Sequence, residues 1–435
     1  MPEISDLSKV ESNARTYAAS FKQLFVKGNG MRLKDAQGRE YLDCLSNAGT
    51  LALGHNPPAV RDAVLEFLQT DQLQQALDLA TPAKHAFVKT LFATLPPALR
   101  EHGKVLFCGP SGSDAVEAAI KLARHYTQRS TLLAFQGGYH GMTAGALSAM
   151  GNLKPKFHAA AVTAGTHFMP FPYPLRCPFG TDGSHTEQLS IDYLRTLLGD
   201  PESGVQQPAA VLVEVVQGEG GCIPASANWM RQLRELTREL GILLIVDEVQ
   251  TGLGRTGSLF AIEHSGIVPD ILVLSKAIGG GYPMSLIVFA EHLDTWTAGM
   301  HAGTFRGNQI AMVAGAATIE HIQANGLVAR AARAGERLRE GLDSLARRYP
   351  ALAEVRGRGL MLGVEIAQPG QDGRPGPADK ALAAAIKREC FAKGLLIETG
   401  GRHSSVLRLL PPLNISDEEI GQVLERLDSA LEAAC

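Results

Sequence analysis

Short apolar runs alternate with amphipathic stretches along most of this chain. Strands are expected wherever apolar residues are continuous, at residues 105–108, 131–135, 209–216, 242–246, 271–274 and 286–289. Continuous runs of this kind are typical of strands that a parallel sheet buries on both faces. Helices are expected where apolar residues recur at helical spacing, at residues 59–67, 84–95, 114–126 and 228–240. The alternation predicts an α/β fold, with a mostly parallel sheet sandwiched by helices.

The last part of the chain has a different pattern. A long helical stretch is broken near Gly326 and ends before Pro350. Short strands and helices follow, and Ser416 with Glu419 forms a capping box for the last helix. This predicts a smaller α+β domain. We expect residues 1–54 to pack with that domain, residues 55–310 to form the large domain, and residues 311–435 to form the C-terminal small domain.

Composition narrows the classes of function. The chain has 435 residues, a hydrophobic share of 45%, a charged share of 20% and a formal net charge of -3, which is ordinary for a soluble globular protein and argues against a nucleic-acid partner. No apolar run approaches the roughly 20 residues of a membrane span, and the charged N-terminus has no signal-peptide core. The six scattered cysteines indicate reduced thiols in a cytoplasmic protein. No HExxH pattern occurs, so no catalytic metal is expected.

Lys276 directly follows the apolar run at residues 271–274 and precedes three consecutive glycines. It therefore lies where open α/β sheets place their ligands. A charged lysine is costly to bury there, but the cost disappears if the amine is neutral or joined to a ligand in a Schiff base. Taken alone, Lys276 is better explained as an ordinary lysine that extends to the surface.

A second candidate site follows the expected strand at residues 105–108. A turn of small residues, which includes Gly112 and Ser113, leads there into a helix. Unpaired backbone N–H groups at a helix N-terminus attract anions, and a serine hydroxyl adds a donor. Gly112 and Ser113 are therefore candidates for binding phosphate. A helix that is simply capped by Ser113 or Asp114 fits the same residues.

Further polar and aromatic groups lie within or after other expected strands. Tyr139 lies among glycines and could present its ring to a flat ligand, although a half-buried turn tyrosine fits as well. Glu214 is inside the run at residues 209–216, and Asp247 ends the run at residues 242–246. Carboxylates in such places require a cation or hydrogen-bond donors.

Residues 252–257 read GLGRTG and match the GxGxxG pattern of dinucleotide-binding folds. In that fingerprint the glycines follow the strand at once and open a helix. Here five residues intervene, beginning with the acidic pair Asp247 and Glu248, which would repel a pyrophosphate. A nicotinamide-dependent dehydrogenase is therefore a distant alternative.

The candidate groups together match the requirements of pyridoxal 5′-phosphate. A helix N-terminus can take its phosphate, and Tyr139 can stack on its ring. Lys276 can react with its aldehyde, while Asp247 can hold the proton on its pyridine nitrogen, without which the ring is a weak electron sink. We therefore expect Lys276 and Asp247 to be the catalytic residues, with Lys276 also moving the substrate proton.

The chain resembles the class III aminotransferases, which have fold type I, in motifs spread over almost its whole length. These are SGSDAVEAAIKLAR, FQGGYHGMT, EVVQGEGG, IVDEVQTGLGRTG, LSKAIGGGYP, GTFRGNQ and RLLPPLNIS. The resemblance implies a homodimer with active sites shared at the interface. It implies that the cofactor is bound by Gly112, Ser113, Tyr139, Glu214, Asp247, Val249, Gln250 and Lys276, and by Thr304 from the neighbouring subunit. It further implies that Arg408 binds a substrate α-carboxylate, with Glu219 as its ionic partner.

The variants CGPSGSDAVEA, FQGGYHGM and HAGTFRGNQ are most similar to the diaminobutyrate–2-oxoglutarate aminotransferase branch. That similarity implies transfer of the terminal amine of L-2,4-diaminobutyrate to 2-oxoglutarate, giving aspartate 4-semialdehyde and glutamate, or the reverse. Alternatives are a class III enzyme with an ornithine, acetylornithine or 4-aminobutyrate donor, and a same-fold aminomutase or decarboxylating enzyme. The expected partners are an amino donor and a 2-oxo acid, with neither nucleic acid nor membrane.

Overall fold

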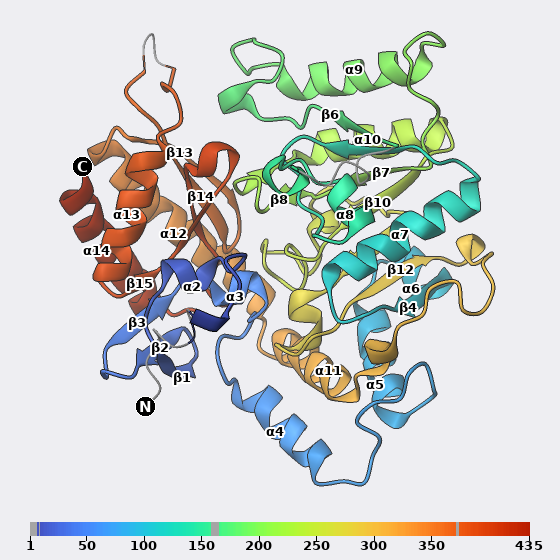
Figure 1. The fold of residues 1–435 in the computed structure, drawn as a ribbon, viewed down its shortest axis with the longest axis horizontal. Helices are drawn as coiled ribbons and strands as arrows, with labels where there is room; N and C mark the ends of the chain where they lie inside the picture. Colours follow the sequence, from blue (N-terminus) through green and yellow to red (C-terminus); the bar gives the residue numbers. More distant parts are fainter. Residues whose placement is uncertain (1–6, 8, 158–164, 371–373) are drawn as a thin grey trace.

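The computed structural model describes residues 7, 9–157, 165–370 and 374–435 and confirms the expected fold class (Figure 1). The large sheet has the strand order β4-β12-β11-β10-β7-β5-β6. Its strands are β4 (Gly103–Phe107), β5 (Leu132–Phe135), β6 (Thr166–Met169), β7 (Ala210–Val213), β10 (Leu243–Asp247), β11 (Ile271–Leu274) and β12 (Leu286–Ala290). Neighbouring strands are parallel except at β12, which runs antiparallel to both β11 and β4.

The large sheet is buried on both faces, which explains the continuous apolar runs. In β11, Ile271 and Val273 pack in one cluster with the apolar face of α7 (Gly112–Thr127). Leu272 and Leu274 point the other way, into the core that contains α10 (Ala227–Glu239). Because successive strand residues face opposite sides, each apolar run supplies both cores at once.

Long helices join the sheet to the rest of the chain, near the expected positions except for α9, which was not expected. They are α4 (Pro58–Leu68), α5 (Pro82–Thr94), α9 (Thr186–Gly199), α11 (Gln309–Ala324), α12 (Leu327–Arg348), α13 (Lys380–Ala392) and α14 (Asp417–Ala434). The expected break near Gly326 separates α11 from α12, since Gly326 has a left-handed φ of 58°. The capping box at the start of α14 is also confirmed.

Two further four-stranded sheets follow, and the first of them joins N-terminal strands to a C-terminal strand (Figure 1, where blue strands lie beside red and orange elements). One has the order β1-β2-β3-β15 and joins β1 (Phe25–Asn29), β2 (Arg32–Asp35) and β3 (Glu40–Asp43) to β15 (Leu395–Leu396). The other has the order β13-β14-β17-β16 and contains β13 (Leu352–Arg358), β14 (Met361–Ile366), β16 (Glu398–Gly400) and β17 (Val406–Leu409). The N-terminal segment thus contacts the C-terminal part through β3, while domain boundaries at residues 54 and 310 stay a prediction.

Some expected boundaries were wrong. Helix α7 begins at Gly112 with Ser111 as its N-cap, because the Ser111 hydroxyl accepts from the Ser113 N–H at 3.2 Å. Neither Ser113 nor Asp114 is therefore the N-cap. The expected strand at residues 209–216 is split into β7 and the short β8 (Val216–Gln217). Across the described part of the chain, no helix combines the length and hydropathy that crossing a membrane requires.

We predict that Gly315→Ala destabilises the protein by roughly 1–3 kcal/mol, the cost of overpacking a core. Gly315 brings α11 against the turn that follows Lys276, and a Cβ there would lie 2.2 Å from the Ile278 carbonyl oxygen. The matched control is Gly421→Ala in α14, where a Cβ would meet nothing within 4 Å. That change should stabilise by about 0.5–1 kcal/mol. Denaturant unfolding measures both, and equal stability of the two variants would contradict the prediction.

Candidate active site

The predicted site residues converge on one cavity at the carboxyl ends of the large-sheet strands. It measures about 560 Å³, including the solvent at its mouth. The predicted residues that line it are Gly112, Ser113, Tyr139, Glu214, Glu219, Asp247, Val249, Gln250 and Lys276. Arg408 does not line the cavity itself but forms an ion pair with Glu219, which does. Thr304 is exposed at the start of the short helix η7 (Thr304–Gly307).

Lys276 is held at the cavity by a strained turn. It follows β11 with a φ of 50°, a left-handed conformation that non-glycine residues seldom adopt. Its neighbour Ser275 fixes the turn, because the Ser275 hydroxyl donates to the Met284 carbonyl at 2.9 Å. Burial lowers the pKa of the Lys276 amine, and the nearby Glu219 charge only partly opposes this effect. The amine is thereby made a better base and nucleophile at neutral pH.

Asp247 ends β10 and is 4% exposed. One carboxylate oxygen, Oδ1, accepts from the Val249 N–H at 3.0 Å, and the other lies 2.8 Å from Nδ1 of His140. Burial lowers the pKa of His140, but the hydrogen bond to Asp247 and its charge outweigh burial and raise that pKa overall. His140 thus orients the carboxylate. The sequence interpretation passed over His140, although its position beside Tyr139 could have suggested it.

Glu214 lies between β7 and β8 and ties two cavity loops together. Its Oε1 accepts from the Tyr139 N–H and its Oε2 from the Gly218 N–H, each at 2.9 Å. Burial raises the pKa of Glu214 to about 7, with the His140 charge opposing and the Asp247 charge reinforcing the change. In this geometry Glu214 positions the segment that carries Tyr139.

The first turn of α7 forms the opposite end of the cavity. Gly112 is needed there, because a Cβ would lie 3.1 Å from a methyl carbon of Val249. The Ser113 hydroxyl accepts from the Met142 N–H at 3.2 Å, and Ser113 also lines the cavity. Asp114 turns away from the cavity, since its Oδ2 accepts from the Gly109 N–H at 2.5 Å. The first turn therefore offers N–H groups and a hydroxyl to an anion without a carboxylate beside them.

Gln250 provides an independent test of whether the expected cofactor fits. Its Nε2 donates to the Ala48 carbonyl at 3.0 Å. Its Oε1 is buried, lies at the cavity, and has no hydrogen-bond partner among the described residues. A buried acceptor without a partner is costly. The ring hydroxyl of pyridoxal 5′-phosphate would supply the missing donor, so the donor set fits this group.

Arg408 and Glu219 form an ion pair at the edge of the cavity. Arg408 is 1% exposed on β17, and its Nη2 lies 2.7 Å from Glu219 Oε1. Burial lowers the pKa of Arg408, but the charge of Glu219, its hydrogen bond to Arg408 and the nearby Cys222 together raise that pKa overall. The Nε and Nη1 groups of Arg408 have no hydrogen-bond partner within the described chain. They are donors that a ligand carboxylate could use.

Comparison with known proteins agrees with this geometry. The family model described as Aminotransferase class-III matches residues 14–431. The diaminobutyrate–2-oxoglutarate aminotransferase of Rhizobium meliloti is 52% identical over 427 residues, which cover 97% of this chain and 90% of that protein. The Haemophilus influenzae protein of the same name is 43% identical, covering 97% and 93%.

Solved structures have the same fold. An amine transaminase from an uncultivated Pseudomonas species, in a PLP-bound form, superposes with a TM-score of 0.88 at 29% identity and 98% coverage of both chains. The ornithine aminotransferase of Toxoplasma gondii superposes with a TM-score of 0.81 at 27% identity, covering 99% of this chain and 93% of that one.

The raised pKa of Glu214 predicts a pH-dependent stability. The folded protein keeps the Glu214 proton between pH 4.5 and about 7, where the unfolded chain has lost it, so stability falls as pH rises through that range. Glu214→Gln should reduce this slope, by up to about 1.4 kcal/mol per pH unit. Denaturant unfolding at several pH values measures the slope, with Glu239→Gln on the exposed face of α10 as the control. An unchanged slope in Glu214→Gln would contradict the assignment.

Proposed function

This chain belongs to the class III aminotransferases, and from that premise we propose that it moves the terminal amine of L-2,4-diaminobutyrate to 2-oxoglutarate. The products are aspartate 4-semialdehyde and glutamate, or the reaction runs in reverse. Support comes from relatives that carry this activity in their names and are 52%, 43% and 40% identical over nearly the whole chain. The structural observation that carries the proposal is the ion pair of Arg408 with Glu219 at the cavity.

The enzyme is a pyridoxal 5′-phosphate-dependent transaminase. When bound, the cofactor supplies an aldehyde that accepts the amino group and a ring that takes up negative charge. We assign its phosphate to the first turn of α7, at Gly112 and Ser113. We assign its ring to the space between Tyr139 and Val249, with the 3′ oxygen at Gln250.

Two residues carry the proton chemistry in this proposal. Lys276 Nζ, whose pKa burial lowers, takes the proton from the substrate carbon that bears the amine and later returns a proton. Asp247 holds the proton on the pyridine nitrogen. His140 keeps the Asp247 carboxylate aimed at that nitrogen through its contact at 2.8 Å. Glu214 holds the Tyr139 segment against the ring by its bond to the Tyr139 N–H.

The ion pair allows one cavity to serve two unlike donors. Glutamate carries a carboxylate on its reacting carbon, which the planar guanidinium of Arg408 can bind in two hydrogen bonds. The terminal carbon of the diamine carries none, so a bare Arg408 would stand as a buried, unpaired charge near a cationic substrate. Glu219 neutralises Arg408 in that half-reaction. Because the Glu219 side chain is 34% exposed, it has room to swing aside for glutamate.

We also propose that the enzyme is a cytoplasmic homodimer whose subunits share active sites. Thr304 is exposed and does not line the cavity of its own chain. Its segment is nevertheless tied to the helix that receives the phosphate, because His301 Nε2 lies 3.2 Å from Asp114 Oδ2. An exposed Thr304 in this place suits contact with the phosphate of the neighbouring subunit.

A panel of amino donors with 2-oxoglutarate tests the proposed reaction. L-2,4-diaminobutyrate should give glutamate at the highest kcat/KM among diaminobutyrate, ornithine, acetylornithine and 4-aminobutyrate. Lys276→Ala should fold but lose turnover, since it removes the amine that takes the substrate proton in this proposal. If diaminobutyrate is ignored while another donor is used, the substrate assignment is wrong. Appreciable turnover by Lys276→Ala would remove Lys276 from its role.

Glu219→Ala separates the two half-reactions. The variant should slow the diaminobutyrate half by roughly tenfold or more, the equivalent of about 1.4 kcal/mol, and spare or improve the glutamate half. Single-turnover absorbance changes of the cofactor measure each half. Glu239→Ala, which removes an exposed partner of Arg195, is the control and should change neither. Equal losses in both halves of Glu219→Ala would refute the switch.

A further inference from the structure

Arg402 begins the short helix η8 (Arg402–Ser404), between β16 and β17. Its Nη2 is buried and has no hydrogen-bond partner within the described part of the chain. The guanidinium does contact the ring of Tyr173, whose centroid lies 5.2 Å from Arg402 Cζ. Because arginine stays charged in proteins, Arg402 is a partly buried cation whose buried donor, Nη2, no group of the described chain accepts. Such a group has a free-energy cost unless a ligand or solvent satisfies it.

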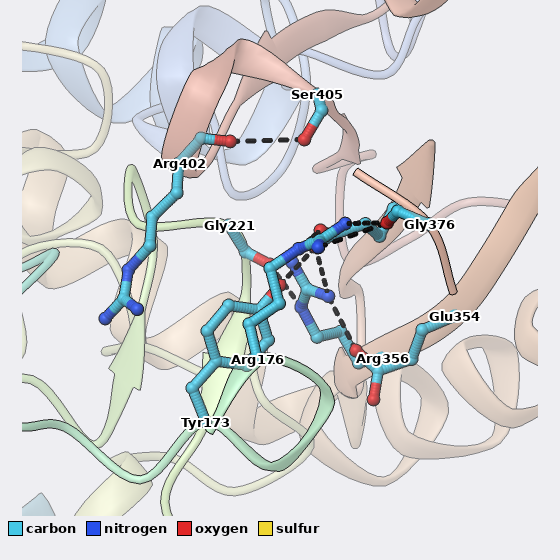
Figure 2. Close-up of polar contacts among 9 residues, drawn as sticks. Tyr173, Arg176, Gly221, Glu354, Arg356, Gly376, Arg402 and Ser405 are labelled. Carbon is cyan, nitrogen blue, oxygen red and sulfur yellow. Dashed lines mark hydrogen bonds and ion pairs between the residues drawn. The ribbon is translucent and has the colours of Figure 1, made fainter. Parts of the chain in front are cut away.

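The neighbouring ionic groups do not satisfy Arg402. Glu365 is shared by other partners, since its Oε1 lies 2.6 Å from Arg176 Nε and its Oε2 lies 2.8 Å from Arg356 Nη1. The Tyr173 hydroxyl also donates to Glu365. Figure 2 shows the Arg402 guanidinium extending away from this cluster, while the dashed line at Arg402 joins its backbone oxygen to Ser405. The unpaired Nη2 of Arg402 therefore points away from the cluster around Glu365.

Arg402 lies between two segments that form the cavity wall. The preceding residue, Gly401, donates its N–H to the carbonyl of Glu219 at 2.8 Å. On the other side, a Cβ built on Gly137 would lie 3.8 Å from Arg402 Nε. Glu219 lines the cavity, as does Tyr139, which is two residues beyond Gly137. The guanidinium therefore stands beside the cavity, at the place where the small domain meets the large one.

The proposed substrate carries an α-carboxylate at the end that does not react, and neither Arg408 nor Glu219 binds it. In the diamine half-reaction Glu219 occupies Arg408, so the α-carboxylate at the far end of diaminobutyrate needs another cation. We propose that Arg402 binds this carboxylate and thereby selects diamines that are amino acids over plain diamines. The planar guanidinium suits two hydrogen bonds to a carboxylate. This inference rests on the proposed function.

The test compares L-2,4-diaminobutyrate with 1,3-diaminopropane, which differs by lacking the carboxylate. The wild type should prefer diaminobutyrate in kcat/KM. Arg402→Gln should lower that preference roughly 10- to 100-fold, the loss of a charged hydrogen bond, mainly through the KM for diaminobutyrate. Arg402→Lys, which keeps the charge, should lose less. Both variants should also slow the glutamate half-reaction, because the γ-carboxylate of glutamate lies as many bonds from its reacting carbon as the α-carboxylate of diaminobutyrate does.

Arg176→Gln is the matched control, because Arg176 belongs to the same cluster but bonds to Glu365 and the Gly376 carbonyl. It should leave the preference intact. An unchanged preference in both Arg402 variants, or an equal loss in Arg176→Gln, would overturn the role of Arg402. If Arg402→Gln does not fold, the KM of Arg402→Lys for diaminobutyrate is the test. A raised KM supports the role of Arg402, and an unchanged KM overturns it. A wild type that ignores diaminobutyrate would instead refute the proposed function, which is a distinct result.

Discussion

The burial of a carboxylate at the end of β10 organises the active site. Asp247 is kept there by the ring of His140 and the N–H of Val249. His140 comes from the loop after β5, and the same loop is held by Glu214, which follows β7. Three strand ends are thereby tied together by hydrogen bonds to buried carboxylates. Because each carboxylate is costly to bury without its donors, the loops have little freedom to move apart.

Buried charged groups with hydrogen-bond partners also join the C-terminal strands to the loops of the large sheet. Arg408 is buried on β17 and reaches across to Glu219, while Arg356 Nε on β13 donates to the Gly221 carbonyl at 2.8 Å. Both contacts converge on the glycine-rich turn after β8 (Figure 2 shows the Gly221 contact). The substrate side of the cavity is therefore built by residues from both domains. A shift of β13 and β17 relative to this turn would move the Arg408 and Arg356 donors away from it.

Much of the large domain could be predicted from local pattern. Strands buried on both faces appear as continuous apolar runs, and a polar residue that ends such a run marks the sheet edge, as Asp247 and Lys276 do. The strand β13 was missed because its segment, LAEVRGR, has few apolar residues and depends on pairing with β14. The N-cap of α7 was predicted at Ser113 or Asp114 and is Ser111. Each of these short polar side chains can accept a hydrogen bond at a helix start, so the local pattern does not single out one of them.

By itself, the sequence determined the fold class, the family, and most of the residues that line the cavity, because these follow from periodicity and from motifs short enough to be local. The tertiary structure alone decided which distant groups become partners. His140 meets Asp247, β3 pairs with β15, and Arg402 Nη2 is left without a hydrogen-bond partner among the residues that the structure describes. No spacing along the chain encodes these contacts, since they arise only when strands and loops far apart in sequence are packed at one sheet edge.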